Sequence, residues 1–189
     1  MIQDSGERRE FDTGAVRDMQ SGKGRFDLMP VGVVAGLFEV CGFPAYVTNV
    51  LYLIDDFIYG DCNDESRLIL AARIFIKNNY QDLPTAMLEV AKHFEEGAEK
   101  YGENNWKRGL PRNCYIDSAV RHFMKFLRGD TDEPHDRAFL WNLMCCIWQT
   151  NEDERNTAGD EATLEDADEA AKAAAAIAKV ARAVIDEKD

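Results

Sequence analysis

Three glutamates, Glu95, Glu96 and Glu99, have the side-chain type and the spacing that a divalent-metal site requires. On a helix, residues 95 and 99 lie one turn apart, and residues 96 and 99 are also neighbours. Each such pair of like charges costs a few tenths of a kcal/mol in an isolated helix. A solvated acidic face is the alternative interpretation. The apolar stripe beside them and a second acidic group later in the chain favour a metal site.

The second acidic group lies two segments further along the chain, between residues 130 and 136. Antiparallel packing of the two segments would form the cage of oxygen ligands that Mg²⁺ requires, with Mn²⁺ as a substitute ion. Asp117, on the segment between them, is an additional candidate. The expected metal ligands are Glu95, Glu96, Glu99, Asp132, Glu133 and Asp136.

This ligand set predicts cleavage of a nucleoside triphosphate. Mg²⁺ bridging the phosphate oxygens neutralises their charge and polarises phosphorus, while a spare carboxylate or a second metal activates water. Basic side chains would hold the phosphates and stabilise the charge that develops on pyrophosphate. Arg121 and Lys125 are the candidates between the acidic groups, and Lys100 directly follows the glutamates. For Arg121, an ion pair with Asp117 one turn earlier is the alternative.

His135 and Asp136 form an adjacent pair, as in metal-dependent HD phosphohydrolases. The chain has three histidines, and no ordered series of further ligands accompanies this pair, so an HD mechanism is kept as an alternative. On a helix, His135 and Asn142 share a face. They could therefore bind substrate together in one polar pocket, or they could form a purely structural pair.

Asn105 and Trp106 lie in the loop that follows the three glutamates. An aromatic face and an amide are what a purine pocket requires, because the base is held by stacking and by hydrogen bonds to its edge. Packing of Trp106 within the loop is the alternative. We therefore expect Asn105 and Trp106 to contact the base.

Helical periodicity dominates the elements that would position these residues. The segment 139–148 is apolar on all sides except at Asn142, which is typical of a helix at the centre of a bundle. No strand alternation and no internal repeat is convincing, so the sequence predicts an all-α fold. Helices are expected over residues 30–42, 44–59, 64–80, 84–101, 113–128 and 134–149.

The chain divides into a catalytic domain, residues 1–150, and an appendage, residues 151–189. Residues 1–29 are expected to form an ordered arm or a flexible leader, in which Gly22 and Gly24 flank Lys23. The appendage combines an acidic linker over residues 151–160 with an Ala-rich helix that Thr163 would cap. The pair of helices at 44–59 and 64–80 carries no evident chemistry, and a dimer contact is its expected role.

Composition limits the classes of partner. The net charge of -13 would repel a nucleic acid polymer. Residues 100–128 nevertheless carry a surplus of basic side chains that could hold a small phosphorylated ligand. The five cysteines include no C-x-x-C pair and favour a reducing compartment. The polar N-terminus and the absence of a long apolar run predict a cytoplasmic protein without a membrane segment.

The sequence also resembles a known family. The stretches HFEEGAEKYGENNWKRGLP (93–111), DSAVRHFMKFLRGDTDEPHD (117–136) and FLWN (139–142) are similar to the phage- and prophage-type dATP/dGTP diphosphohydrolases. The arm segments FDTGAVRD (11–18) and GKGRFDLMP (22–30) also resemble that family's N-terminal signature. The resemblance covers about residues 8–150.

This family is related to the MazG-like pyrophosphohydrolases, so the resemblance implies an all-α, Mg²⁺-dependent enzyme. It implies a homodimer or homotetramer that converts dATP or dGTP to the monophosphate and pyrophosphate, in host cytoplasm if a phage encodes it. Glu95, Glu96 and Glu99 match the E-E-x-x-E motif, and Glu133 and Asp136 match E-x-x-D. Pro134 places that second motif at a helix start, which leaves Asp117 or Asp132 as alternative ligands.

The R-H motif of the resemblance adds His122, beside Arg121, to the expected catalytic residues. Two interpretations other than a pyrophosphohydrolase stay open. One is the HD-type nucleotide phosphohydrolase. The other is a protein without catalysis, either a nucleotide sensor or an acidic helical interaction protein.

Overall fold

The computed structural model describes residues 6–60 and 64–159. The chain separates into two compact units, Met1–Asn151 and Glu152–Asp189. The first unit contains every residue that the sequence places in the site.

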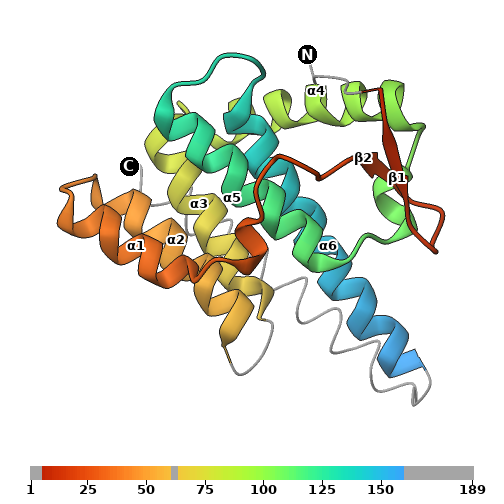
Figure 1. Cartoon of the computed structure of the whole chain (residues 1–189), viewed down its shortest axis with the longest axis horizontal. Coiled ribbons are helices and arrows are strands. Elements are labelled where there is room, and N and C mark those ends of the chain that lie inside the picture. Colours follow the sequence, from red (N-terminus) through yellow and green to blue (C-terminus); the bar gives the residue numbers. More distant parts are fainter. Residues whose placement is uncertain (1–5, 61–63, 160–189) are drawn as a thin grey trace. The chain divides into compact units, whose positions relative to one another are not determined.

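The described part of the chain is mostly helical, which confirms the predicted fold class (Figure 1). Six α-helices follow one another with short connections. They are α1 (Val31–Val40), α2 (Ala45–Tyr59), α3 (Glu65–Asn79), α4 (Leu83–Tyr101), α5 (Arg112–Arg128) and α6 (His135–Gly159), with 3-10 turns η1 (Phe26–Leu28) and η2 (Asn105–Arg108).

Local sequence explains where these helices begin and end. Asp64 and Asp82 cap α3 and α4, since their carboxylates accept hydrogen bonds from the backbone N–H groups of Ser66 and Thr85. Gly129 ends α5 with a φ of 84°, in the left-handed region that glycine adopts without steric cost. The α5–α6 loop therefore starts at a fixed point, which matters because it carries part of the second acidic group.

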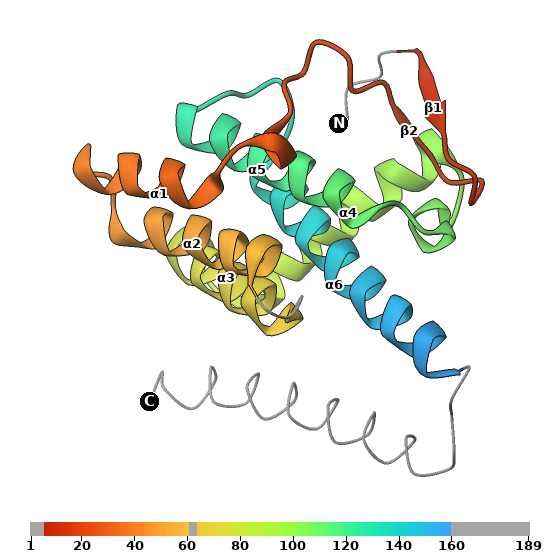
Figure 2. The same ribbon diagram turned by 60° about the horizontal axis from the view of Figure 1, so that its bottom comes forward.

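The core is centred on Phe75 of α3. Its ring centroid lies 4.7 Å from that of Phe139 on α6 and 5.8 Å from that of Phe123 on α5. All three rings are fully buried, so this cluster fixes α5 and α6, which carry Arg121, Lys125 and Asp136 of the expected site. Helices α2 and α3 pack side by side (Figures 1 and 2).

From residue 6 onward the N-terminal arm is ordered, and it contains two short strands that the sequence does not predict. Strand β1 (Arg8–Glu10) pairs antiparallel with β2 (Val16–Asp18), with Arg9 opposite Arg17. Gly14, at a φ of 75°, makes the tight turn between them. Strands of three residues are too short to show an alternating pattern, so the hairpin leaves no periodic signal.

Helix α6 is longer than the sequence predicts. Its central segment is buried, as expected, but the helix continues to Gly159 through the residues expected to form an acidic linker. An i,i+3 ion pair between Glu152 and Arg155 supports this extension. The Ala-rich helix expected after Thr163 lies outside the described residues.

Among the described helices, none has the length and apolar character needed to cross a membrane.

Replacing Phe75 with Ala should reduce the free energy of unfolding by about 3–5 kcal/mol, because it removes a buried aromatic ring and leaves a cavity. Urea unfolding followed by circular dichroism measures this change. Leu88→Ala is the matched control. Leu88 is 68% exposed, so its truncation should cost less than about 0.5 kcal/mol. Equal losses in both variants would contradict the assignment of the core.

Candidate functional site

A cavity of about 990 Å³ opens between the N-terminal arm, α4, η2, α5 and α6. Five acidic side chains line it, and so do aromatic rings from η1, α4, η2 and α6. Six basic side chains also line it, although the whole chain is strongly acidic. They are Arg9, Arg17, Lys23, Arg121, Lys125 and Arg128.

Helix α5 supplies the polar wall because its chemistry-bearing residues recur every three or four positions. Asp117, Arg121, Lys125 and Arg128 line the cavity together with His122. The opposite side of the helix carries buried apolar residues such as Phe123. An amphipathic helix of this kind gathers charged groups on one face, which is how a single segment can bring several cations to one ligand.

Asp117 fastens the arm to α5. Its carboxylate accepts hydrogen bonds from Gln20 Nε2 and from the backbone N–H of Phe26, both at 2.8 Å. It also forms an ion pair with Arg121, so the alternative role expected for Arg121 is present. Arg121 in turn donates to the backbone oxygen of Lys23 at 3.2 Å, while still lining the cavity.

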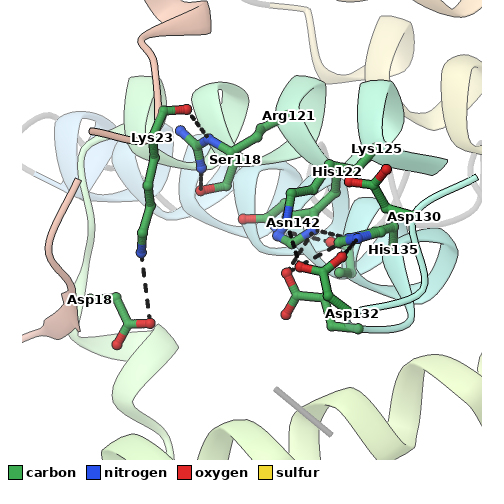
Figure 3. Close-up of polar contacts among 12 residues, drawn as sticks. Asp18, Lys23, Ser118, Arg121, His122, Lys125, Asp130, Asp132, His135 and Asn142 are labelled. Carbon is green, nitrogen blue, oxygen red and sulfur yellow. Dashed lines mark hydrogen bonds and ion pairs between the residues drawn. The ribbon is translucent and has the colours of Figure 1, made fainter. Parts of the chain in front are cut away.

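The carboxylate of Asp18, on β2, forms ion pairs with three cations. It lies 2.7 Å from Lys100 Nζ, 3.3 Å from Arg8 Nη1 and 3.8 Å from Lys23 Nζ. Burial lowers the pKa of Lys23, although the charge of Asp18 opposes this shift. Figure 3 shows Lys23 reaching from the arm towards Asp18. Lys100, expected to meet phosphate, is thus paired with the arm and does not itself line the cavity.

Asn105 also holds the arm. Its Oδ1 accepts from the backbone N–H of Val16 and its Nδ2 donates to the backbone oxygen of Val16, both at 2.8 Å. Trp106 packs its ring edge-to-face against Phe94 and Trp148, with centroids 5.5 and 5.0 Å away. Asn105 and Trp106 both line the cavity, so the two residues expected to contact a base lie where a base could bind.

Asn142 is buried and accepts a hydrogen bond from Arg17 Nη2 at 2.6 Å. Arg17 also donates to the backbone oxygen of Cys114 at 2.9 Å, and its guanidinium lies 5.3 Å from the centre of the Tyr115 ring. Asn142 therefore orients an arginine of the arm within the cavity wall. We expected His135 to share a polar pocket with Asn142. The hydrogen-bonding contacts of His135 in the described part of the chain involve other residues instead.

The three glutamates of α4 have different surroundings. Glu95 is exposed and lines the cavity. Glu96 forms an ion pair with Arg137 at 2.7 Å; burial alone would raise its pKa, but the hydrogen bond and charge of Arg137 lower it. Glu99 is exposed and does not line the cavity.

The second acidic group is also divided. Asp136 accepts a hydrogen bond from the hydroxyl of Tyr80 at 2.7 Å, and Asp132 pairs with Lys125 at 2.7 Å. Two groups of three side chains in the described part of the chain bring their ligand atoms within 4.8 Å of one another. One contains Glu133 and the other Asp132, and neither includes the α4 glutamates. The two groups are His122–Glu133–His135 and Asp130–Asp132–His135.

The two histidines face each other through their Nδ1 atoms, which lie 3.0 Å apart. The Nε2 of His135 lies 2.7 Å from a carboxylate oxygen of Asp132, as the dashed lines in Figure 3 show. Burial, and then the nearby His135, hold the pKa of His122 well below its usual range. Hydrogen bonds from Lys125 and then from His135 lower the pKa of Asp132.

His93, on α4, lines the same cavity. Burial, and then the charge of Arg137, lower its pKa to about 4, so the ring is neutral at pH 7. Its Nδ1 is buried and has no hydrogen-bond partner in the described part of the chain. A bound ligand could therefore use this nitrogen.

Sequence reasoning missed the arm residues Arg9, Arg17, Asp18 and Gln20, all of which line the cavity. Their roles depend on contacts with residues 82 to 125 positions away, which local patterns do not encode. The glycines that flank Lys23 were the available signal, since both adopt positive φ angles just before η1, which packs against α5.

Replacing Asp117 with Ala should release the arm, because it removes one acceptor shared by three donors. Hydrogen–deuterium exchange should show protection of the arm amides, including that of Phe26, falling at least about tenfold while α2 and α3 keep theirs. Asp12→Ala is the control, since Asp12 is an exposed acid of the same arm. Unchanged protection in Asp117→Ala would show that other contacts hold the arm.

Part of the chain matches a known protein family. Residues 71–159 match the sequence model of a family described as dATP/dGTP diphosphohydrolase, N-terminal. No curated protein and no solved structure matches the chain. The matched stretch spans α4, η2, α5 and α6, so the similarity covers all the cavity walls except the arm.

Proposed function

We propose that this protein cleaves a purine deoxynucleoside triphosphate, dATP or dGTP, between the α and β phosphates. The products are the deoxynucleoside monophosphate and pyrophosphate. The observation that carries the proposal is the cavity, which combines aromatic and cationic walls. The similarity of the same segments to a dATP/dGTP diphosphohydrolase family supports it.

The cavity suits a nucleotide in size and chemistry. Its volume of about 990 Å³ is at the upper end of the range for small-molecule sites. The base would stack on Trp106. Asn105, which keeps one amide hydrogen and one acceptor lone pair beyond its bonds to Val16, would contact the edge of the base. His135 and Asn142 stay in the proposal as residues that shape the polar side of the pocket.

The triphosphate would meet the basic face of α5 and the arm. Arg121 and Lys125 would contact phosphate oxygens and stabilise the charge that develops on pyrophosphate. Lys100 would act through Asp18, with which it pairs, to set the position of Lys23. A bound phosphate would take the place of some of the carboxylates that now pair with these cations.

The residues present fit a Mg²⁺ ion that arrives with the nucleotide. Mg²⁺ is usually held by one or two carboxylates together with substrate phosphates and water, and the carboxylate of Glu95 lines the cavity. Glu96 and Glu99, on the same turn of α4, and Asp132, Glu133 and Asp136 remain proposed ligands. Bound Mg²⁺ would supply charge neutralisation at the triphosphate.

The chain's own groups would then position the reaction. Glu95 would orient the attacking water by accepting its hydrogen bond, and Arg121 would hold the leaving phosphates. His122 is neutral at pH 7 because of its lowered pKa, so it would act as a hydrogen-bonding group in the wall.

We also propose a cytoplasmic homodimer or homotetramer. The exposed apolar residues Val33, Leu37 and Val40 of α1 support self-association.

Incubation with dGTP and Mg²⁺ should yield dGMP and pyrophosphate, because attack between the α and β phosphates separates those products. Anion-exchange chromatography of the reaction, repeated with dATP, dCTP and the ribonucleotides, measures both the products and the preference. Deoxyguanosine plus tripolyphosphate would instead indicate the HD-type reaction. Saturable nucleotide binding with no product over several hours would indicate a sensor.

Replacing Glu95 with Gln should lower kcat/KM for dGTP by at least about 100-fold, because it removes a carboxylate that orients water and contacts the metal. Steady-state kinetics at saturating Mg²⁺ measures the loss, and circular dichroism checks the fold. Glu39→Gln, at an exposed position of α1 outside the cavity, is the matched control and should keep wild-type activity. Full activity in Glu95→Gln would remove this residue from the mechanism.

A further inference from the structure

Three ligand atoms converge at the end of α5 and the start of α6. The Nδ1 atoms of His122 and His135 lie 3.0 Å apart. Glu133 Oε1 lies 3.5 Å from the first nitrogen and 3.7 Å from the second. The side chains of His122 and Glu133 are 15% and 13% exposed, and that of His135 is 1% exposed. The group is therefore a largely buried one with mixed nitrogen and oxygen donors.

We propose that His122, Glu133 and His135 form a binding site for a divalent transition-metal ion of the zinc class. This site shares Glu133 with the carboxylate set proposed for Mg²⁺ and differs from that set in its two histidine ligands. Two imidazoles and one carboxylate suit borderline ions such as Zn²⁺, Co²⁺ and Mn²⁺, whereas Mg²⁺ prefers oxygen ligands alone. The inference rests on the geometry of these three residues and holds whatever reaction the protein catalyses.

The spacing of the three atoms matches the size of such an ion. A triangle with sides of 3.0, 3.5 and 3.7 Å has a circumscribed circle with a radius of about 2.0 Å. Zinc lies about 2.0–2.2 Å from imidazole nitrogen and carboxylate oxygen. An ion at the centre of the triangle would therefore be at bonding distance from all three ligands without any movement of the chain.

Asp132 prepares His135 for this role. Its carboxylate oxygen lies 2.7 Å from His135 Nε2, so that nitrogen carries the proton and donates it. In the neutral ring the Nδ1 then presents a lone pair towards His122 and Glu133. A carboxylate that fixes the tautomer of a ligating histidine through its other nitrogen is the usual outer partner of a metal-bound imidazole.

A hydrogen bond between the histidines explains less of the geometry. The Nδ1–H of His122 could donate to the Nδ1 of His135, which would account for their separation. The oxygen of Glu133 would then lie beside both nitrogens at 3.5 and 3.7 Å, which is too far for a good hydrogen bond. A cation between the three atoms would satisfy all of them at once.

The second group, Asp130–Asp132–His135, is a poorer site. Arg128 pairs with Asp130, and Lys125 pairs with Asp132, so both carboxylates already have cationic partners. The Nε2 of His135, which faces Asp132, would have to lose its proton to bind an ion there. The first group needs no such exchange.

The position of the site gives the ion access to a ligand. His122 and Glu133 both line the cavity, whereas His135 is buried and does not line it. Two histidines, one carboxylate and a fourth position open to water or substrate form the ligand set of many catalytic zinc ions. A phosphate or carboxylate group bound in the cavity could therefore reach the ion directly.

The test uses the full-length protein after treatment with a chelator. Titration with Co²⁺, followed by visible absorption, and with Zn²⁺, followed by calorimetry, should show one ion per chain with d–d bands and no cobalt–thiolate charge-transfer band. His122→Gln and His135→Asn should each weaken binding at least about 100-fold. Asp132→Asn should weaken it about 10- to 100-fold, as loss of an outer partner does.

Asp130→Asn is the matched control, because Asp130 belongs only to the second group and its loss should leave affinity unchanged. Circular dichroism of each variant separates loss of binding from loss of fold. Failure of folded wild-type protein to bind either ion saturably would overturn the proposal. So would strong binding that survives in His122→Gln but disappears in Asp130→Asn.

Discussion

The buried carboxylate of Asp117 is the contact on which the cavity depends. Removing a charged group from water is costly unless hydrogen bonds and an opposite charge replace the solvent. Here the replacement comes from Gln20, the backbone N–H of Phe26 and Arg121. Two of these donors belong to the arm, so burial of this single charge requires the arm to lie against α5, where it completes the wall of the cavity.

The same pairing principle runs through the rest of the site. Asp18, Asp117 and Asp132 neutralise Lys100, Arg121 and Lys125, respectively. Each cation is thereby held in place before any ligand binds. While no ligand is bound, the carboxylates also neutralise the local positive charge. An entering phosphate does not need to order flexible side chains, which reduces the entropy lost on binding. It must instead compete with carboxylates, so a ligand with several negative charges is favoured.

The helices could be predicted from sequence because periodicity and capping are local. The start of α4 after its cap Asp82 and the end of α5 before Gly129 follow from a few neighbouring residues. The partners of Glu96 and Asp136 could not be predicted, since Arg137 and Tyr80 reach them through the tertiary fold. Carboxylates that belong to the same sequence motif therefore have different partners in the folded protein. The facing histidines likewise depend on how α6 begins after Pro134, which spacing alone does not determine.

Asn105 has a consequence for the hairpin that extends beyond the cavity. A strand at the edge of a sheet exposes unpaired N–H and C=O groups, and these invite pairing with another chain. By accepting from and donating to Val16, the amide of Asn105 imitates the peptide group of a third strand. One side chain thereby blocks the outer edge of β2 against intermolecular sheet growth, and the short hairpin keeps its place without a further strand beside it.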